Sequence, residues 1–161
     1  MLILGCGNRD RADDAAGLLV AARLRELGID ARARGGDMLA LIDEWSSEQE
    51  VIIVDAVISG RAPGAITIWD VGQAALPSVC FSCSTHALGV AEAVELARAL
   101  ERLPHELTIC GIEAINFAVD GALSPEVAAA VERLAQDLAA KARRKPEQQR
   151  RQNGSIVFDP G

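Results

Sequence analysis

Aromatic residues are scarce in this chain, where they make up 3% of 161 residues, and tyrosine is absent. Proteins that bind single-stranded nucleic acid stack bases on aromatic side chains, so we expect no nucleic-acid partner. The net charge of −7 also opposes binding to a phosphate backbone. The core must be built from Ala, Leu, Val and Ile, which suits helices packed on a parallel sheet.

The sequence also lacks the features of a membrane or secreted protein. No apolar run approaches the roughly 20 residues of a membrane span. The apolar segment 2–4 is too short for a signal peptide and runs directly into glycine. We therefore expect a cytoplasmic protein with no membrane partner. Its four cysteines are then expected to be reduced thiols.

Several catalytic motifs are missing. There is no G-x-S-x-G nucleophile elbow, so nothing supports an α/β-hydrolase, and there is no P-loop. The loop after the first strand has Gly5 and Gly7, but Asp10 takes the third glycine position of G-x-G-x-x-G. Because nearby acids would also repel a pyrophosphate, we expect no dinucleotide site.

The length fits one domain. We expect residues 1–143 to form a single α/β domain and residues 144–161 a basic, disordered tail, because 141–161 carries six Lys or Arg against two Asp or Glu. Apolar spacing predicts strands at 2–4, 29–34, 50–54, 65–69 and 106–111, and helices at 13–27, 38–45, 86–103 and from Pro125 to about Arg143. Strand 65–69 follows its predecessor without room for a crossover helix, so we expect it to be antiparallel or at an edge.

Three chemically active residues follow predicted strand ends. Asp14 lies in the loop after the first strand, Asp55 directly follows the apolar run 51–54, and His86 begins a predicted helix. Ligands of open α/β sheets bind beyond the carboxyl ends of the strands, where these side chains would converge. Two carboxylates and one imidazole suit a divalent ion such as Ni²⁺ or Zn²⁺. The helix dipole would keep His86 neutral, as metal binding requires.

Ordinary structural roles remain open for these residues. Asp14 could stabilise the helix dipole as a first-turn acid, and Asp13 could do so equally well. His86 could bond to a backbone carbonyl. Asp55 is harder to explain in this way, since a carboxylate after four buried β-branched residues is costly unless it is paired or functional.

The cysteines offer another interpretation. Cys80 and Cys83 form a C-x-x-C, and His86 follows three residues later, which could be half of a zinc site or a redox pair. No second C-x-x-C or H-x-x-H completes a zinc knuckle. Cys6 and Cys110 lie on or beside predicted strands and could belong to the core.

The ordered set of motifs resembles the nickel-iron hydrogenase maturation proteases over residues 1–138. Their G-x-G-N-x(4)-D-[DE]-x-x-G segment is similar to residues 5–17, and their apolar strand ending in D-A is similar to 51–56. Further matching segments are the P-G turn at 62–66, the S-x-H element at 84–89, Gly-Ile-Glu at 111–113, and 123–127.

This resemblance implies a three-layer α/β/α sandwich with a five-stranded sheet, and metal ligands at Asp14, Asp55 and His86. It implies an endopeptidase that removes a C-terminal extension from the nickel-loaded precursor of a hydrogenase large subunit. Nickel would arrive with the substrate, with zinc or cadmium as substitutes, and the enzyme would be a monomer.

The residues leave two mechanisms and two other functions open. The metal could be catalytic, or it could serve recognition while a free carboxylate, Asp13 or Asp55, acts as general base. The chain could also be a noncatalytic nickel-sensing assembly chaperone, or a zinc or redox module built on Cys80 and Cys83.

Overall fold

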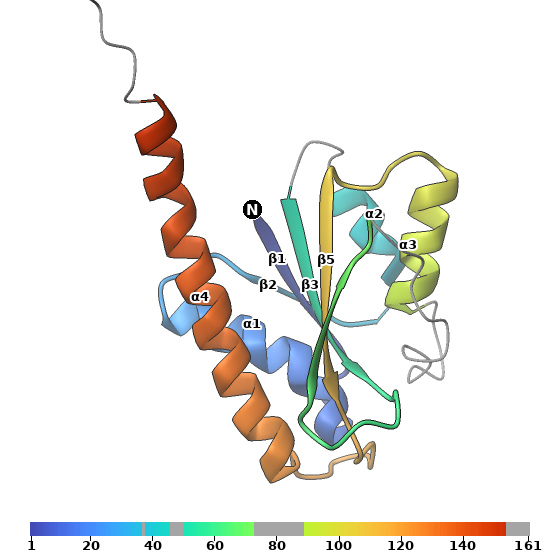
Figure 1. Ribbon diagram of the computed structural model, residues 1–161. Coiled ribbons are helices and arrows are strands. Elements are labelled where there is room, and N and C mark those ends of the chain that lie inside the picture. Colours follow the sequence, from blue (N-terminus) through green and yellow to red (C-terminus); the bar gives the residue numbers. More distant parts are fainter. Residues whose placement is uncertain (37, 46–49, 73–88, 154–161) are drawn as a thin grey trace, which may run out of the picture.

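A five-stranded sheet forms the centre of the computed structural model, which describes residues 1–36, 38–45, 50–72 and 89–153 (Figure 1). The strand order is β2-β1-β3-β5-β4. All neighbouring strands are parallel except β4, which pairs antiparallel with β5 at the sheet edge. The strands are β1 (Leu2–Cys6), β2 (Arg32–Arg34), β3 (Glu50–Val57), β4 (Ile66–Asp70) and β5 (Glu106–Glu113).

Helices cover both faces of this sheet. One face packs against α1 (Ala16–Glu26) and α4 (Pro125–Asn153), and the other against α2 (Leu41–Glu44) and α3 (Val90–Ala99) (Figure 1). Two short 3₁₀ turns, η1 (Ala12–Ala15) and η2 (Met38–Ala40), precede α1 and α2. The expected α/β/α sandwich, mostly parallel with one antiparallel edge strand, is confirmed.

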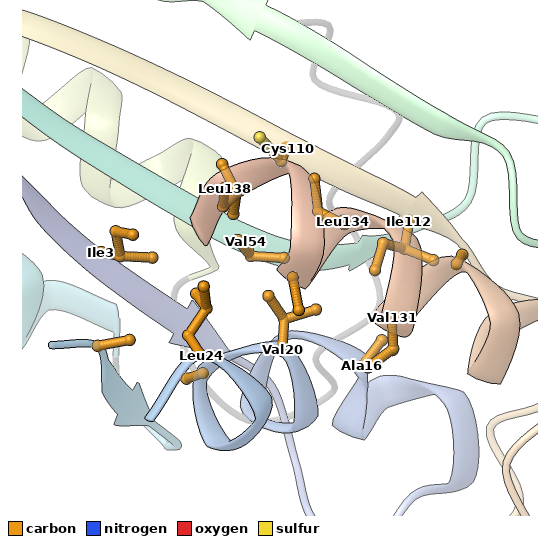
Figure 2. Packing of buried hydrophobic residues seen from close by; sticks show 14 of the residues in the cluster. Ile3, Ala16, Val20, Leu24, Val54, Cys110, Ile112, Val131, Leu134 and Leu138 are labelled. Atoms are coloured by element: carbon orange, nitrogen blue, oxygen red, sulfur yellow. The ribbon is translucent and has the colours of Figure 1, made fainter. Parts of the chain in front are cut away.

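The core between the sheet and the α1/α4 layer is aliphatic throughout. Val20 and Leu24 of α1 lie beside Leu134 and Leu138 of α4, above strand residues such as Val54 (Figure 2). Burying an aliphatic side chain of this size stabilises the fold by about 1.5–3 kcal/mol. With little aromatic volume available, many small side chains must share the packing, which brings α1 close to the sheet.

Glycines permit that close approach. A Cβ on Gly17, in the first turn of α1, would collide with the carbonyl oxygens of Cys6 and Val54. A Cβ on Gly5 would collide with the carbonyl oxygen of Gly17. The start of α1 therefore rests on the backbone of β1 and β3, at the ends of those strands.

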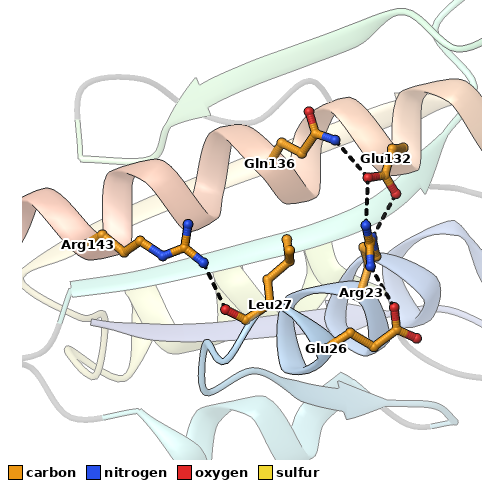
Figure 3. A network of polar contacts seen from close by, with 6 residues as sticks. All are labelled: Arg23, Glu26, Leu27, Glu132, Gln136 and Arg143. Carbon is orange, nitrogen blue, oxygen red and sulfur yellow. Dashed lines mark hydrogen bonds and ion pairs between the residues drawn. The ribbon is translucent and has the colours of Figure 1, made fainter.

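Polar contacts on the outer surface join α1 to α4. Arg23 donates from Nε to Glu132 at 2.8 Å and from Nη1 to Glu26 at 2.8 Å (Figure 3). Arg143 donates to the carbonyl oxygen of Leu27 at 2.9 Å, where α1 ends. Exposed polar contacts of this kind are screened by water and contribute little, so the apolar layer beneath them holds the helices together.

The element boundaries differ from the sequence expectations in four places. Strands β3 and β5 extend to Val57 and Glu113 because they pair with each other over their whole length. The predicted helices 13–27 and 38–45 each begin with a 3₁₀ turn. Helix α3 begins at Val90, while the first residues of predicted helix 86–103 lie outside the described residues.

The end of helix α4 is the fourth difference, while the disordered tail expected for residues 144–161 stays a prediction. Helix α4 starts at Pro125 as expected but continues through Asn153, past Arg143. The added segment is rich in Arg, Lys, Glu and Gln, which have high helix propensity and extend an already nucleated helix. Within the described ranges, no helix has the length and apolar character needed to cross a bilayer.

The contact at Gly17 yields a stability prediction. We expect Gly17→Ala to lower the free energy of unfolding by more than about 3 kcal/mol, since backbone atoms of two strands must move to admit one methyl group. The control is Leu19→Ala on the exposed side of the same helix, for which we expect less than about 1 kcal/mol. Urea unfolding followed by circular dichroism measures both, and similar losses in the two variants would contradict the assignment.

Candidate active site

The candidate site lies where the order of the sheet reverses. From β1 the chain crosses to β2 on one side, and β3 then pairs with β1 on the other side. The ends of β1 and β3 therefore diverge into different connections, and in such sheets a ligand crevice usually lies at this point. Asp14 lies in η1, directly after β1, and Asp55 lies in β3 opposite Gly111.

Backbone contacts fix the position of Asp14. Its N–H donates to the carbonyl oxygen of Arg11 at 2.8 Å, and its own carbonyl oxygen accepts from the N–H of Asn8 at 3.1 Å. Gly7 has a φ of 145°, and a Cβ there would collide with the Asp14 carbonyl oxygen. The loop therefore folds back over the end of β1, which leaves Asp14 only 6% exposed.

The carboxyl groups of Asp14 and Asp55 repel each other when both are charged. Burial raises the pKa of Asp14, with Arg11 opposing the shift. Burial and then the charge of Asp14 raise the pKa of Asp55 to about 7, while a 2.9 Å hydrogen bond from the Ala56 N–H opposes them. Adjacent carboxylates with raised pKa values are typical of functional sites, and a divalent cation would relieve their repulsion.

The third predicted ligand, His86, lies outside the described residues, as do Cys80 and Cys83. In the part of the chain that the structure describes, no three His, Cys, Asp or Glu side chains gather into a metal-binding group. Asp14 and Asp55 thus supply two oxygen donors, and a cation held here would need its remaining ligands from elsewhere. The assignment of Asp14, Asp55 and His86 as catalytic and metal-binding residues stays a prediction.

Asp13 differs from Asp14 in its hydrogen bonding and in the direction of its pKa shift. It is fully buried, and its two oxygens accept hydrogen bonds from the N–H groups of Ile115, Asn116 and Ser124 and from the Ser124 hydroxyl. Burial raises the pKa of Asp13, but these hydrogen bonds outweigh it and leave the pKa below its usual range. A carboxylate so fully bonded is a poor general base, which leaves Asp55 as the candidate.

Cys6 ends β1 near the same crevice and is fully buried. Burial, followed by the charges of Asp55 and Glu44, raises the pKa of this thiol well above its ordinary value, against the effect of Arg34. Burial likewise raises the pKa of Cys110 to about 11. Both side chains are therefore neutral thiols at physiological pH, as expected of core cysteines, and unsuited to nucleophilic attack.

Sequence reasoning assigned no role to Glu113 beyond its place in the Gly-Ile-Glu segment. The structure buries this carboxylate at 2% exposure and binds it to the loop after β3. It accepts hydrogen bonds from the N–H groups of Ser59 and Gly60 at 2.8 Å each, and from the Ser59 hydroxyl at 2.6 Å. A charged residue directly after the apolar run of β5 was the signal that could have identified it.

The raised pKa of Asp55 predicts how stability depends on pH. The folded chain holds the Asp55 proton up to about pH 7 and the unfolded chain only to about 3.8, so stability falls as pH rises between them. We expect metal-free Asp55→Asn to be more stable than wild type by about 1–3 kcal/mol at pH 8. The full shift would give about 4 kcal/mol, and partial contact with solvent reduces it.

This advantage should nearly disappear at pH 4, where Asp55 of the folded wild-type protein is protonated and as neutral as the asparagine that replaces it in the variant. Urea titrations at pH 4 and pH 8 in the presence of a chelator measure the two differences. An advantage of the same size at both pH values would show that the charge of Asp55 is not its source.

Comparisons with known proteins agree on one family. Residues 26–141 match the family model described as hydrogenase maturation protease. A candidate hydrogenase maturation protease of Methanocaldococcus jannaschii is 30% identical over 145 residues, which cover 83% of this chain and 90% of that protein. The hydrogenase 2 maturation protease of Escherichia coli is 27% identical over 139 residues, which cover 82% of this chain and 84% of that protein.

A solved structure agrees with these matches. The hydrogenase maturating endopeptidase HybD from E. coli superposes with a TM-score of 0.72 at 26% identity, covering 89% of this chain and 92% of that one. The predicted family is thereby confirmed together with the fold. The crevice at the ends of β1 and β3 belongs to a protease scaffold, and this chain is a member of the hydrogenase maturation protease family.

Proposed function

We propose that this protease removes a C-terminal extension from the nickel-loaded precursor of a nickel-iron hydrogenase large subunit. One observation carries the proposal: Asp14 and Asp55 interact at the switch point of a sheet shared with maturation endopeptidases. The names of the relatives support the class of substrate. We further propose that the enzyme acts as a monomer in the cytoplasm.

The chemistry of the donors suits a cation that arrives with the substrate. Asp14 and Asp55 are hard oxygen ligands, and His86 would add an imidazole, a set that suits nickel and admits zinc or cadmium. Because the free enzyme keeps a proton on Asp55 to about pH 7, it pays a cost for binding metal alone. Substrate nickel, once bound here, would polarise the scissile carbonyl.

If nickel serves recognition and Asp55 does not ligate it, Asp55 has the pKa expected of a general base at neutral pH. In its ionised form it would take a proton from the attacking water while the water oxygen bonds to the scissile carbonyl carbon. It would then return that proton to the departing amide nitrogen as the peptide bond breaks. Asp14 would keep its charge beside Asp55 and hold the cation, and fully hydrogen-bonded Asp13 would take no part.

Mass spectrometry of the processed substrate tests this proposal. We expect the purified protein to shorten a nickel-loaded large-subunit precursor from its own organism by the mass of a C-terminal peptide. Asp55→Asn should slow this cleavage at least about 100-fold, the scale on which a general base contributes. Precursor without nickel should remain uncut. Stable binding with no mass change would favour the nickel-sensing assembly chaperone.

A double Cys80→Ser and Cys83→Ser variant separates the protease from a cysteine-based zinc or redox module. If Asp14, Asp55 and His86 carry the chemistry, the variant should process the precursor within about threefold of the wild-type rate, because neither thiol would then take part in the reaction. Loss of processing in a folded variant would show that Cys80 and Cys83 carry the function.

A further inference from the structure

Asp13 links parts of the chain that are more than a hundred residues apart in the sequence. Its Oδ2 accepts from the N–H groups of Ile115 at 3.1 Å and Asn116 at 2.9 Å, and from the hydroxyl of Ser124 at 2.8 Å. Its Oδ1 accepts from the Ser124 N–H at 2.7 Å. In return, the Asp13 N–H donates to the Asn116 carbonyl oxygen at 2.9 Å. One side chain thus ties η1 to the loop after β5 and to the start of α4.

That loop is itself well ordered by internal contacts. Asn116 donates from Nδ2 to the Ala122 carbonyl oxygen at 3.0 Å and accepts from the Ala118 N–H at 3.1 Å. The N–H of Asp120 donates to the carbonyl oxygen of Asp10 at 2.9 Å. The loop of residues 114–124 therefore offers a fixed support against which the η1 turn can be held.

The η1 turn needs such support for two reasons. Ala12 has a φ of 37°, in the left-handed region that a residue with a Cβ adopts only when its surroundings impose it. Asp14 is also only 6% exposed, and burying a carboxyl group is unfavourable unless other contacts hold it in place. Favourable contacts next to Asp14 must offset both costs, and Asp13 makes the densest set of them.

We propose that Asp13 is a positioning residue, which holds the η1 turn so that Asp14 stays beside Asp55. Its own oxygens never reach the substrate, because all of its bonds are made within the fold. The inference rests on the proposed function only for its kinetic consequence, since the effect on the η1 backbone can be measured without substrate.

Glu113 provides a matched control. It is also a buried carboxylate with several donors, but those donors are Ser59 and Gly60 in the loop after β3. Replacing Asp13 by Asn and Glu113 by Gln removes one charge and part of one acceptor set in each case. A purely stabilising role for Asp13 predicts the same behaviour in both variants, whereas a positioning role predicts a difference.

Amide hydrogen exchange, measured where both variants are fully folded, separates the two roles. We expect Asp13→Asn to speed exchange at the Asp14 and Asn8 amides at least about 10-fold relative to amides of β3. Glu113→Gln should leave these two amides within about twofold of wild type. Equal acceleration in both variants, or none in Asp13→Asn, would overturn the proposal.

Steady-state processing supplies the second measurement. We expect Asp13→Asn to lower kcat at least about 10-fold with KM within about twofold, because misplacement of a catalytic group affects the chemical step. Glu113→Gln should change kcat less than about twofold. A fall in kcat that is equal in the two variants would reduce Asp13 to a stabilising residue.

A milder variant covers the case in which Asp13→Asn does not fold. Ser124→Ala removes only the hydroxyl donor to Oδ2 and should give the same pattern at smaller amplitude, about 2- to 5-fold in both measurements. No change at the η1 amides in this variant would count against positioning. If wild-type protein cuts no precursor, the proposed function fails, while the exchange comparison still decides the role of Asp13.

Discussion

The close approach of α1 to the sheet is the constraint on which the rest of this structure depends. Gly17 lies against the carbonyl oxygens of Cys6 and Val54, and Gly5 lies against Gly17, so that no side chain separates the start of the helix from β1 and β3. The loop before α1 must then turn within a few residues, which it does through Gly7 and the η1 turn. Because that turn is so tight, Asp14 is delivered to the end of β1 rather than to the solvent. A core of small aliphatic side chains permits this close approach, since bulky aromatic residues would hold the helix and the sheet further apart.

Two buried carboxylates, Asp13 and Glu113, and the half-buried Asp55 show how the surroundings of a carboxyl group change its properties. Asp13 and Glu113 accept hydrogen bonds from backbone N–H groups and serine hydroxyls, so their charges are compensated within the fold. Within the described part of the chain, Asp55 accepts one such bond, from the Ala56 N–H, and it faces the charge of Asp14. Repulsion between Asp55 and Asp14 lowers the stability of the folded chain. The same pair of carboxyl groups is suited to binding a cation or taking a proton, and active sites commonly trade stability for function in this way.

The sequence predicted the architecture well because its signals were local and repeated. Alternation of apolar strands with amphipathic helices indicated an α/β sheet, and the short connection before Ile66 correctly placed β4 as an antiparallel edge strand. The strand ends were predicted less well, because β3 and β5 lengthen each other by pairing and neither segment alone carries that information. The end of α4 was predicted less well for a related reason: the polar composition suggested an end near Arg143, but the helix is nucleated by its packed first half and continues through Asn153.

The sequence by itself determined which functional residues are present and which family they indicate. These residues are the glycines of the first loop, Asp14, Asp55 and the ordered motifs of a maturation protease. Only the tertiary structure gave Asp13 and Asp14 their different surroundings. Asp13 and Asp14 are adjacent, identical in type and equally suited to a helix start, and no pattern in the sequence separates them. Folding brings Ile115, Asn116 and Ser124 to Asp13 and brings Asp55 to Asp14. Because a carboxylate's pKa and reactivity depend on the donors and charges that surround it in space, its role is set by residues far away in the chain.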